Sequence, residues 1–377
     1  MAKHKNVPVL RFPEFSDEWE KKRLGEVAPL QRGFDLPVAN IIKGIYPVVF
    51  SNGILKYHNE YKAKSPGVVT GRSGTIGKVS YVENDYWPHN TALWVTDFKN
   101  NHPKFIYYFY SKYNLERFGT GSGVPTLNRN DVHVQIESFP TFSEQQRIAA
   151  FITAVDCKIT QLIQKKALIE QYKKGVMQKI FDQEVRFIND DGNNFTEWAV
   201  KKANKIFKNH SNKKHNGDLP ILAITQDRGA ILRDDLDMNI ISSEASVKSY
   251  KIVEVGDFII SLRSFQGGIE YSNVFGICSP AYTILKPIIE INTDFYKFYL
   301  KNDSFIQELS NTVVGIRDGK QISFDAFSSL KLPYPCPSEQ TKIANFLTVI
   351  DEKINQCSHQ ISKTEQYKKG LLQQLFV

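Results

Sequence analysis

The sequence of 377 residues is poor in cysteine and has no long apolar run, and both shortages exclude classes of protein. No two of its four cysteines form a C-x-x-C pair, which argues against a disulfide framework or a structural zinc site and fits a reducing cytosol. No apolar stretch approaches the length of about 18 residues that a membrane-spanning helix needs. The N-terminal residues lack the apolar segment of a signal peptide. We therefore expect a cytoplasmic protein with no membrane partner.

The usual catalytic motifs are also missing. The stretch Gly71–Lys78 is close to a phosphate-binding loop, but G-x-x-x-x-G-K-[ST] requires glycine where Arg72 stands and Ser or Thr where Val79 stands. No H-E-x-x-H, no G-x-S-x-G and no N-P-P-[FY] tetrapeptide of the amino-methyltransferase kind occurs, and the eight histidines are scattered. These absences predict a protein that is not an enzyme and has no catalytic or metal-ligating residues.

Positive charge is in excess but unevenly distributed. The formal net charge is +8, which favours a polyanionic partner. Residues 1–182 hold 25 Lys and Arg against 17 Asp and Glu, whereas residues 183–377 hold 23 of each. If both halves bind nucleic acid, the second half needs a local basic patch.

The chain contains one long duplicated segment. Residues 143–181 return as residues 338–376 after a shift of 195 residues, without a gap and with 19 of 39 positions identical. In each copy apolar residues recur at steps of four and three, which predicts a helix with a coiled-coil seam. At about 1.5 Å per residue each helix would be roughly 58 Å long. We expect the two helices to act as spacers that pair antiparallel in a pseudo-twofold arrangement.

The helix starts and an internal glycine give further expectations. Ser143 with Gln146 forms a capping box, while Ser338 is followed by Thr341 and predicts a weaker cap. Gly175 and Gly370 lie within the helical pattern and allow a local bend or a close helix crossing.

The segments outside the repeat differ from each other and predict two mixed domains. Short apolar runs bounded by Gly, Asn and Pro indicate strands, among them Tyr46–Phe50, Gly67–Thr70, Lys78–Val82, Ile221–Ile224, Val255–Leu262 and Ala281–Leu285. Aromatic-rich helices are expected at about Pro103–Phe118 and Thr293–Ser310. The predicted fold class is α+β, with domains at 1–142 and 183–337 and long helices at 143–182 and 338–377.

Each predicted domain carries two basic, glycine-bearing loops. In the first loop a strand runs into Arg-Ser and a glycine-containing turn, at Arg72-Ser73 and again at Arg263-Ser264. Glycine permits close backbone approach, and arginine can bind a phosphate or a guanine edge. The second loop is Gly119–Arg129 in one domain and Asn311–Ser323 in the other. A solvated hairpin turn is the alternative reading of the Arg-Ser pair, but its recurrence favours contact.

The order domain, long helix, domain, long helix resembles the DNA-specificity (S) subunit of type I restriction-modification systems. The resemblance rests on the helix starts Ser143-Glu144-Gln145 and Ser338-Glu339-Gln340 and the helix ends E-Q-Y-K-K-G at 170–175 and 365–370. The Gly71–Lys78 turn and the segment Phe15–Trp19 are also similar to family patterns, so the resemblance covers essentially the whole chain.

The resemblance implies two target-recognition domains, each reading half of a bipartite, asymmetric sequence in double-stranded DNA. It implies that two modification subunits carrying S-adenosylmethionine dock on the helices, that restriction subunits using ATP and Mg²⁺ can join, and that this chain itself binds no cofactor. The expected DNA-binding residues are Arg72, Ser73, Thr75, Lys78, Ser122, Asn128, Arg129, Arg263, Ser264, Gln266, Arg317, Lys320 and Gln321. The expected partner-binding residues are Gln145, Phe151, Tyr172, Lys173, Gln340, Phe346, Tyr367 and Lys368.

Two alternatives remain open at this point. The chain could be a coiled-coil scaffold that binds proteins only, in which case DNA binding would be absent or insensitive to salt. It could also be a basic, metal-dependent nuclease whose carboxylates follow no recognised pattern, in which case the isolated chain would cut DNA.

Overall fold

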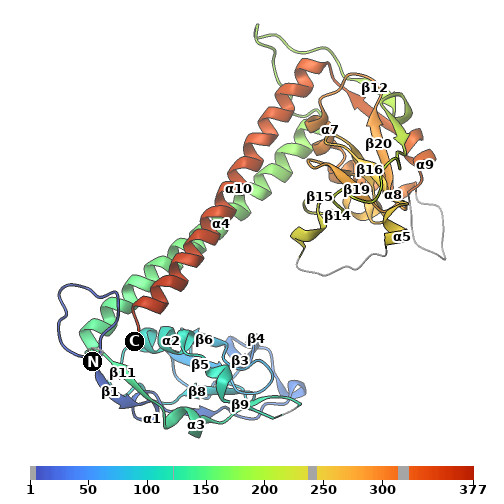
Figure 1. The fold of residues 1–377 in the computed structure, drawn as a ribbon. Coiled ribbons are helices and arrows are strands. Elements are labelled where there is room, and N and C mark those ends of the chain that lie inside the picture. Colours follow the sequence, from blue (N-terminus) through green and yellow to red (C-terminus); the bar gives the residue numbers. More distant parts are fainter. Residues whose placement is uncertain (1–5, 122, 237–243, 313–321) are drawn as a thin grey trace. The chain divides into compact units, whose positions relative to one another are not determined.

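The computed structural model describes residues 6–121, 123–236, 244–312 and 322–377. The chain divides into two compact units, one formed by residues 1–164 with 359–377 and the other by residues 165–358. Each unit combines one mixed domain with part of each of the two long helices, α4 (Phe142–Phe181) and α10 (Pro337–Gln374) (Figure 1).

The domain of the first unit is built on a four-stranded antiparallel sheet in the order β2-β8-β5-β6. A three-stranded sheet, β4-β3-β7, and the pairs β1-β11 and β9-β10 complete it. Its strands are β1 (Glu20–Arg23), β2 (Leu30–Arg32), β3 (Tyr46–Phe50), β4 (Gly53–His58), β5 (Gly67–Gly71), β6 (Val79–Val82), β7 (Trp87–Pro88), β8 (Ala92–Val95), β9 (Gly119–Thr120), β10 (Thr126–Leu127) and β11 (Ile136–Phe139). Its helices are α1 (Leu24–Val27), η1 (Val38–Asn40), α2 (Pro103–Lys112), η2 (Leu115–Phe118) and α3 (Arg129–His133).

The domain of the second unit repeats the four-stranded antiparallel sheet, here in the order β13-β20-β17-β18, with the pairs β14-β15, β16-β19 and β12-β21. Its strands are β12 (Ala199–Lys202), β13 (Phe207–His210), β14 (Leu222–Thr225), β15 (Gly229–Leu232), β16 (Lys251–Val253), β17 (Phe258–Ile260), β18 (Glu270–Tyr271), β19 (Gly276–Cys278), β20 (Thr283–Pro287) and β21 (Lys331–Tyr334). Its helices are η3 (Ala203–Lys205), η4 (Arg233–Asp235), α5 (Glu244–Val247), α6 (Ser264–Gly267), α7 (Thr293–Tyr299), α8 (Asp303–Asn311) and α9 (Phe324–Ser329).

Most predicted strands are present, but the aromatic-rich helices are shorter than expected. In the first unit α2 ends at Lys112, because Tyr113 leaves the helix in an extended conformation and stacks its ring on Phe109 and Phe118. In the second unit the side chain of Asn302 accepts a hydrogen bond from Ser304 N at 2.9 Å and starts a new helix, α8. The expected strand Val255–Leu262 shrinks to β17.

The two long helices begin earlier than the predicted caps. Helix α4 starts at Phe142 and α10 at Pro337, so Ser143 and Ser338 lie inside the first turn and the capping-box prediction was wrong. Proline suits the first position of α10, because its missing N–H would have no helical partner there.

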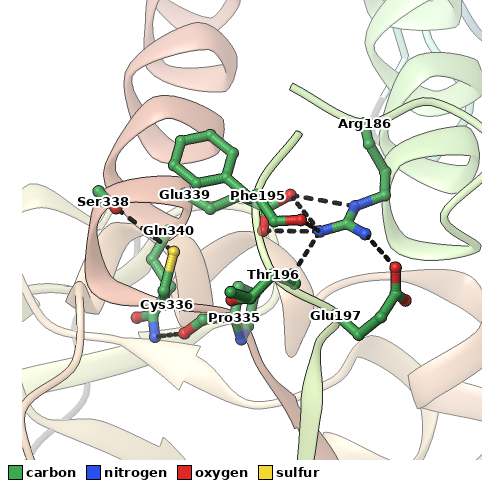
Figure 2. A network of polar contacts seen from close by, with 9 residues as sticks. All are labelled: Arg186, Phe195, Thr196, Glu197, Pro335, Cys336, Ser338, Glu339 and Gln340. Atoms are coloured by element: carbon green, nitrogen blue, oxygen red, sulfur yellow. Dashed lines mark hydrogen bonds and ion pairs between the residues drawn. The ribbon is translucent and has the colours of Figure 1, made fainter. Parts of the chain in front are cut away.

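A buried glutamate anchors the start of each long helix. Arg186 reaches Glu339, which is fully buried, and also donates to Thr196 O at 2.6 Å (Figure 2). In the first unit Arg11 contacts the equivalent buried Glu144 with two hydrogen bonds of 2.8 Å. Both arginines precede their helix by more than a hundred residues. Each domain is therefore tied to its helix by an ion pair that the solvent barely reaches.

The predicted seam is the observed packing face of both helices. In the first unit Ile148, Ile152 and Val155 of α4 share a core with Leu371 and Leu375 of α10. In the second unit the end of α4 shares a core with the start of α10, through Ile180, Ile343, Leu347 and Ile350. The helices run antiparallel, as expected (Figure 1). Apart from its chain neighbours and the backbone of its own helix, no atom of the described residues lies within 4 Å of a Cβ placed on Gly175 or on Gly370, so neither glycine serves a close crossing.

The C-terminal residues complete the core of the first unit. Phe376 is 4% exposed, and its ring centroid lies 5.1 Å from that of Phe105 in α2. The carbonyl oxygen of Gln374 accepts a hydrogen bond from Leu10 N at 2.9 Å. The last turn of the second long helix is thus part of the first domain.

Replacing Phe376 with alanine should destabilise the first unit by about 3 kcal/mol, because the change leaves a cavity among packed aromatic rings. Peptide-resolved hydrogen exchange would locate the loss in residues 1–164, since the two units need not open together. Phe142→Ala is the matched control, because that ring is 47% exposed. Equal effects of the two changes would contradict the assignment of Phe376 to the core.

Candidate nucleic-acid interface

In the first unit the two predicted loops lie against each other. Leu127 N donates to Arg72 O at 2.8 Å, and Ser73 pairs with Thr126 in an isolated antiparallel bridge. The loop after β5 and the loop before α3 therefore form one surface, although more than fifty residues separate them in the sequence.

A hollow of about 250 Å³ opens where these loops meet, and three arginines line it. Its lining includes three residues that the sequence predicted as contacts, Arg72, Asn128 and Arg129. Arg32, which was not among the predicted contacts, lies there as well. Leu93, Thr120, Thr126 and Leu127 complete the lining. No acidic residue appears among the lining residues that the structure describes. Guanidinium groups and an amide around a small concavity suit phosphate oxygens or the acceptor edge of a guanine.

The position of Arg32 is set by a carboxylate beside the hollow. Arg32 Nη2 donates to Asp35 Oδ1 at 2.8 Å, and the side chain of Asn90 donates to the same oxygen. The hydrogen bonds from Asn90 and from Arg32 lower the pKa of Asp35, so its charge persists. A sequence signal for Arg32 was available, because Arg32 adjoins Gly33 just as Arg72 adjoins Gly71. In the structure a Cβ at either glycine would collide with a backbone carbonyl oxygen.

Of the other predicted residues of the first turn, Lys78 reaches the β3–β4 hairpin. Lys78 Nζ donates to Asn52 O at 2.6 Å, at the exposed tip of that hairpin. Thr75 is exposed and Ser73 is half-buried. The hairpin tip, with Asn52, therefore joins the same face, and nothing in its sequence pattern pointed to contact with a ligand.

In the second unit the Arg-Ser loop differs from its expected form. Residues after Arg263 form the short helix α6 rather than an open glycine turn. Ser264 is fully buried, and its hydroxyl accepts a hydrogen bond from Ser261 N at 2.8 Å. Its predicted DNA contact is therefore corrected, because the side chain is used inside the domain. Arg263 and Gln266 are exposed and stay in the proposed contact set.

An ion pair with a buried carboxylate stabilises the loop that contains Arg263. Lys301 Nζ lies 2.6 Å from the buried carboxylate of Glu270 and donates to Gly267 O and Gln226 O. Burial raises the pKa of Glu270 and lowers that of Lys301, while the pairing opposes both shifts. Gln226 Nε2 also donates to Arg263 O at 3.2 Å. The β14–β15 turn that contains Gln226 thus flanks the Arg263 loop, as the β3–β4 turn flanks the Arg72 loop.

A larger cavity of about 720 Å³ in the second unit does not have the charge of a nucleic-acid site. Its ionisable lining is balanced, with the cations Lys173, Lys174, Arg228, Lys297 and Lys301 and the anions Glu170, Asp227, Glu270, Asp303 and Asp351. We therefore prefer the smaller hollow near Arg72 as the contact surface.

Four predicted contact residues, Ser122, Arg317, Lys320 and Gln321, lie outside the described residues. Among the residues that are described, no helix is long and apolar enough to cross a membrane. Within the same ranges, no three His, Cys, Asp or Glu side chains gather as metal ligands would.

Comparison with known proteins decides what kind of molecule carries these surfaces. The family model for the type I restriction modification DNA specificity domain matches residues 16–171 and again residues 195–364. The chain belongs to this family. It is a DNA specificity subunit of a type I restriction-modification system, which is the non-catalytic subunit.

Relatives of this specificity subunit are distant in sequence. It is 24% identical over 293 residues to the MjaVIII specificity subunit of Methanocaldococcus jannaschii, a match that covers 71% of this chain and 68% of that one. It is 25% identical over 154 residues to the EcoprrI specificity subunit of Escherichia coli, covering 39% and 38% of the two chains.

Solved structures share the fold of the specificity subunit over nearly its whole length. The S subunit from M. genitalium aligns with a TM-score of 0.61 at 16% identity and covers 98% of this chain and 99% of its own. A chain from a solved structure that concerns complex assembly and conformational transition of the type I R-M system aligns with a TM-score of 0.57 at 17% identity. The match covers 94% of this chain and 96% of that chain. At this identity the likeness concerns the fold alone.

The predicted partner-binding residues of the helices have different surroundings. Gln145 and Gln340 are buried, and their amides bond to backbone groups within their own units, for example Pro140 O and Pro335 O. They hold domain and helix together, so we remove them from the proposed partner surface. Phe151 and Phe346 are half-buried against Phe12 and Phe187, respectively.

The E-Q-Y-K-K-G segments present one pair of side chains outward and one pair inward. Tyr172 and Tyr367, at equivalent repeat positions, are 57% and 55% exposed. Lys173 and Lys368 instead form ion pairs with aspartates of the opposite helix. The two tyrosines are the strongest remaining members of the proposed partner surface.

Proposed function

We propose that this specificity subunit reads a bipartite, asymmetric DNA sequence, with one half-site bound by each domain and the separation set by the helix pair. The observation that carries the proposal is the cationic hollow of Arg32, Arg72 and Arg129 on a domain that is attached to a duplicated helical frame. Two different domains attached to two equivalent helices would read two different half-sites at a constant distance.

We further propose that residues 1–142 and 183–337 are the two recognition domains and that residues 143–182 and 338–377 are the two spacer helices. Two methyltransferase subunits carrying S-adenosylmethionine would dock on the helices, with Tyr172 and Tyr367 in the contact. Restriction subunits using ATP and Mg²⁺ would join them, and the complex would work in the cytoplasm. The chain's own residues position DNA, whereas the methyl transfer belongs to the partner.

Mapping of methylated adenines in host DNA, with and without the gene for this chain, would test the proposal. A bipartite motif that disappears with the chain is the expected result. In vitro, affinity should fall steeply with salt, because lysine and arginine release counterions from phosphates. A protein-only scaffold is favoured instead if binding to DNA is absent or indifferent to salt.

Arg72→Ala should relax sequence preference in the first half-site and leave the second unchanged. An arginine that binds a base edge supplies about 1–3 kcal/mol of discrimination, so the enrichment of one base should fall by roughly 5-fold to 150-fold at that position. Selection from a random DNA library by the full chain would measure this.

The control is Arg147→Ala, which removes the same charge from helix α4, where the side chain is 60% exposed. If Arg72→Ala weakens binding equally on every sequence, Arg72 contacts a phosphate and reads no base.

A further inference from the structure

Two ion pairs join the long helices, one within each unit, and the internal repeat relates them. Lys368 Nζ lies 2.6 Å from Asp156 Oδ1 in the first unit, and Lys173 Nζ lies 2.6 Å from Asp351 Oδ1 in the second. The shift of 195 residues converts Asp156 into Asp351 and Lys173 into Lys368. All four side chains are between 22% and 32% exposed, so solvent screens them only in part.

Each ion pair also touches the domain of its own unit. Tyr108 of α2 donates its hydroxyl to Asp156 Oδ2 at 2.7 Å, and Lys368 Nζ lies 5.7 Å from the centre of the same ring. In the second unit Lys173 Nζ lies 4.8 Å from the ring centre of Phe298 in α7. Each pair is therefore a point where both helices and one domain meet.

The apolar seam alone does not select one alignment of the helices. A slide by one heptad, about 10 Å along the axis, brings apolar positions opposite apolar positions again. The ion pairs do not survive such a slide. Asp156 would then face Ile361 or Leu375, and Lys173 would face Ala344 or Ser358. Three of these four residues are apolar, and a charge that faces an apolar side chain in a partly buried seam is costly. The fourth, Ser358, carries no charge. Of the observed alignment and the two that differ from it by one heptad, only the observed one pairs both aspartates with both lysines.

We propose that Asp156–Lys368 and Lys173–Asp351 are the positioning residues that select the register of the helix pair and thereby the separation of the two DNA half-sites. The proposal rests on the proposed function, because it assigns to these residues the setting of a distance that the domains then use on DNA. The four residues act through the helices and do not contact DNA.

The test reverses one charge and then restores the pair. In Asp351→Lys a lysine faces Lys173, so the register loses one of its two determinants, and several half-site separations should be selected in place of one. Affinity for the original separation should fall about tenfold, while the half-site sequences stay the same. The double variant Lys173→Asp/Asp351→Lys re-forms the pair with opposite polarity and should recover a single separation. Selection of random DNA by the full chain reads the number of unspecified base pairs directly.

Glu352→Lys is the matched control, because it makes the same charge change at the neighbouring exposed position and should behave as the unaltered chain. A merely stabilising ion pair would give a different outcome: Asp351→Lys would lower the melting temperature and still select one separation. That result, or a double variant as altered as the single one, would overturn the proposal.

A second measurement separates this proposal from the proposed function. Spin labels at positions 171 and 353, both exposed and both in the second unit, report the helix alignment without DNA. With Cys157 and Cys336 replaced by serine, the label distance should shift or broaden in Asp351→Lys, by up to about 10 Å for one heptad, and return in the double variant. An unchanged distance contradicts the register role even if the chain binds no bipartite DNA, and a shift in a chain that selects no DNA contradicts the proposed function alone.

Discussion

Replacing Arg186 with methionine is expected to cost the second unit about 3 kcal/mol or more of unfolding free energy. Arg186 holds Glu339, whose side chain is 0% exposed, through contacts of 3.2 to 3.4 Å (Figure 2). The pairing raises the pKa of Arg186, chiefly through the hydrogen bonds to Glu339. Without the guanidinium, a carboxylate would be left buried and unpaired at the start of α10. Peptide-resolved hydrogen exchange on the full chain would measure the loss in residues 165–358.

Glu197→Ala is the control for this prediction, because Glu197 accepts from the same guanidinium at 3.0 Å but is 90% exposed. Exposed ion pairs contribute about 0–1 kcal/mol, so its effect should be small. The double variant Arg186→Met/Glu339→Leu removes both charges and should recover most of the stability. If Arg186→Met alone is no worse than Glu197→Ala, the buried pair does not hold the helix to the domain.

Lengthening both long helices by three heptads should increase the preferred half-site separation by nine or ten base pairs, the largest functional change expected of this chain. Twenty-one helical residues add roughly 32 Å, close to the about 34 Å of one turn of DNA, so each domain would meet the same face of the duplex again. The insertions belong after Gln164 in α4 and after Ser358 in α10, where the boundary between the units crosses each helix. Selection from random DNA by the full chain would report the new separation.

Inserting the three heptads in α4 alone is the control. The unmatched helix cannot keep both Asp156–Lys368 and Lys173–Asp351, so the chain should select no defined bipartite sequence. If the paired insertion leaves the separation unchanged, the helices do not measure the distance between half-sites.

The architecture could be predicted from the sequence because its signals are periodic and repeated. The seam positions Ile148, Ile152 and Leu162, which belong to a stripe of apolar residues at alternating steps of four and three, are all buried in the structure. The gapless repeat also implied that the two helices would be equivalent. Asp156 and Asp351, at equivalent repeat positions, confirm this, because each forms an ion pair with a lysine of the opposite helix. The capping box failed, because a local motif cannot reveal that the chain already enters the helix at Phe142.

The candidate site could be predicted only in part. Arg72, Asn128 and Arg129 were found because glycine-bearing basic loops follow strands, and the structure brings them together in one hollow. Ser264 occupies the place of Ser73 in the Arg-Ser pattern that recurs in the two domains, but it is buried, since α6 turns its hydroxyl toward Ser261. A loop pattern carries no information about which side of the loop faces the core.

The sequence by itself determined the helical frame, its duplication and its antiparallel pairing, because helical periodicity and a gapless repeat can both be recognised in the linear order of the residues. The tertiary structure alone decided that Asn52 and Gln226 flank the arginine loops, and that Glu144 and Glu339 are buried against arginines distant in the sequence. These groupings arise when strands and loops pack around a core, and packing joins residues whose spacing in the sequence follows no period.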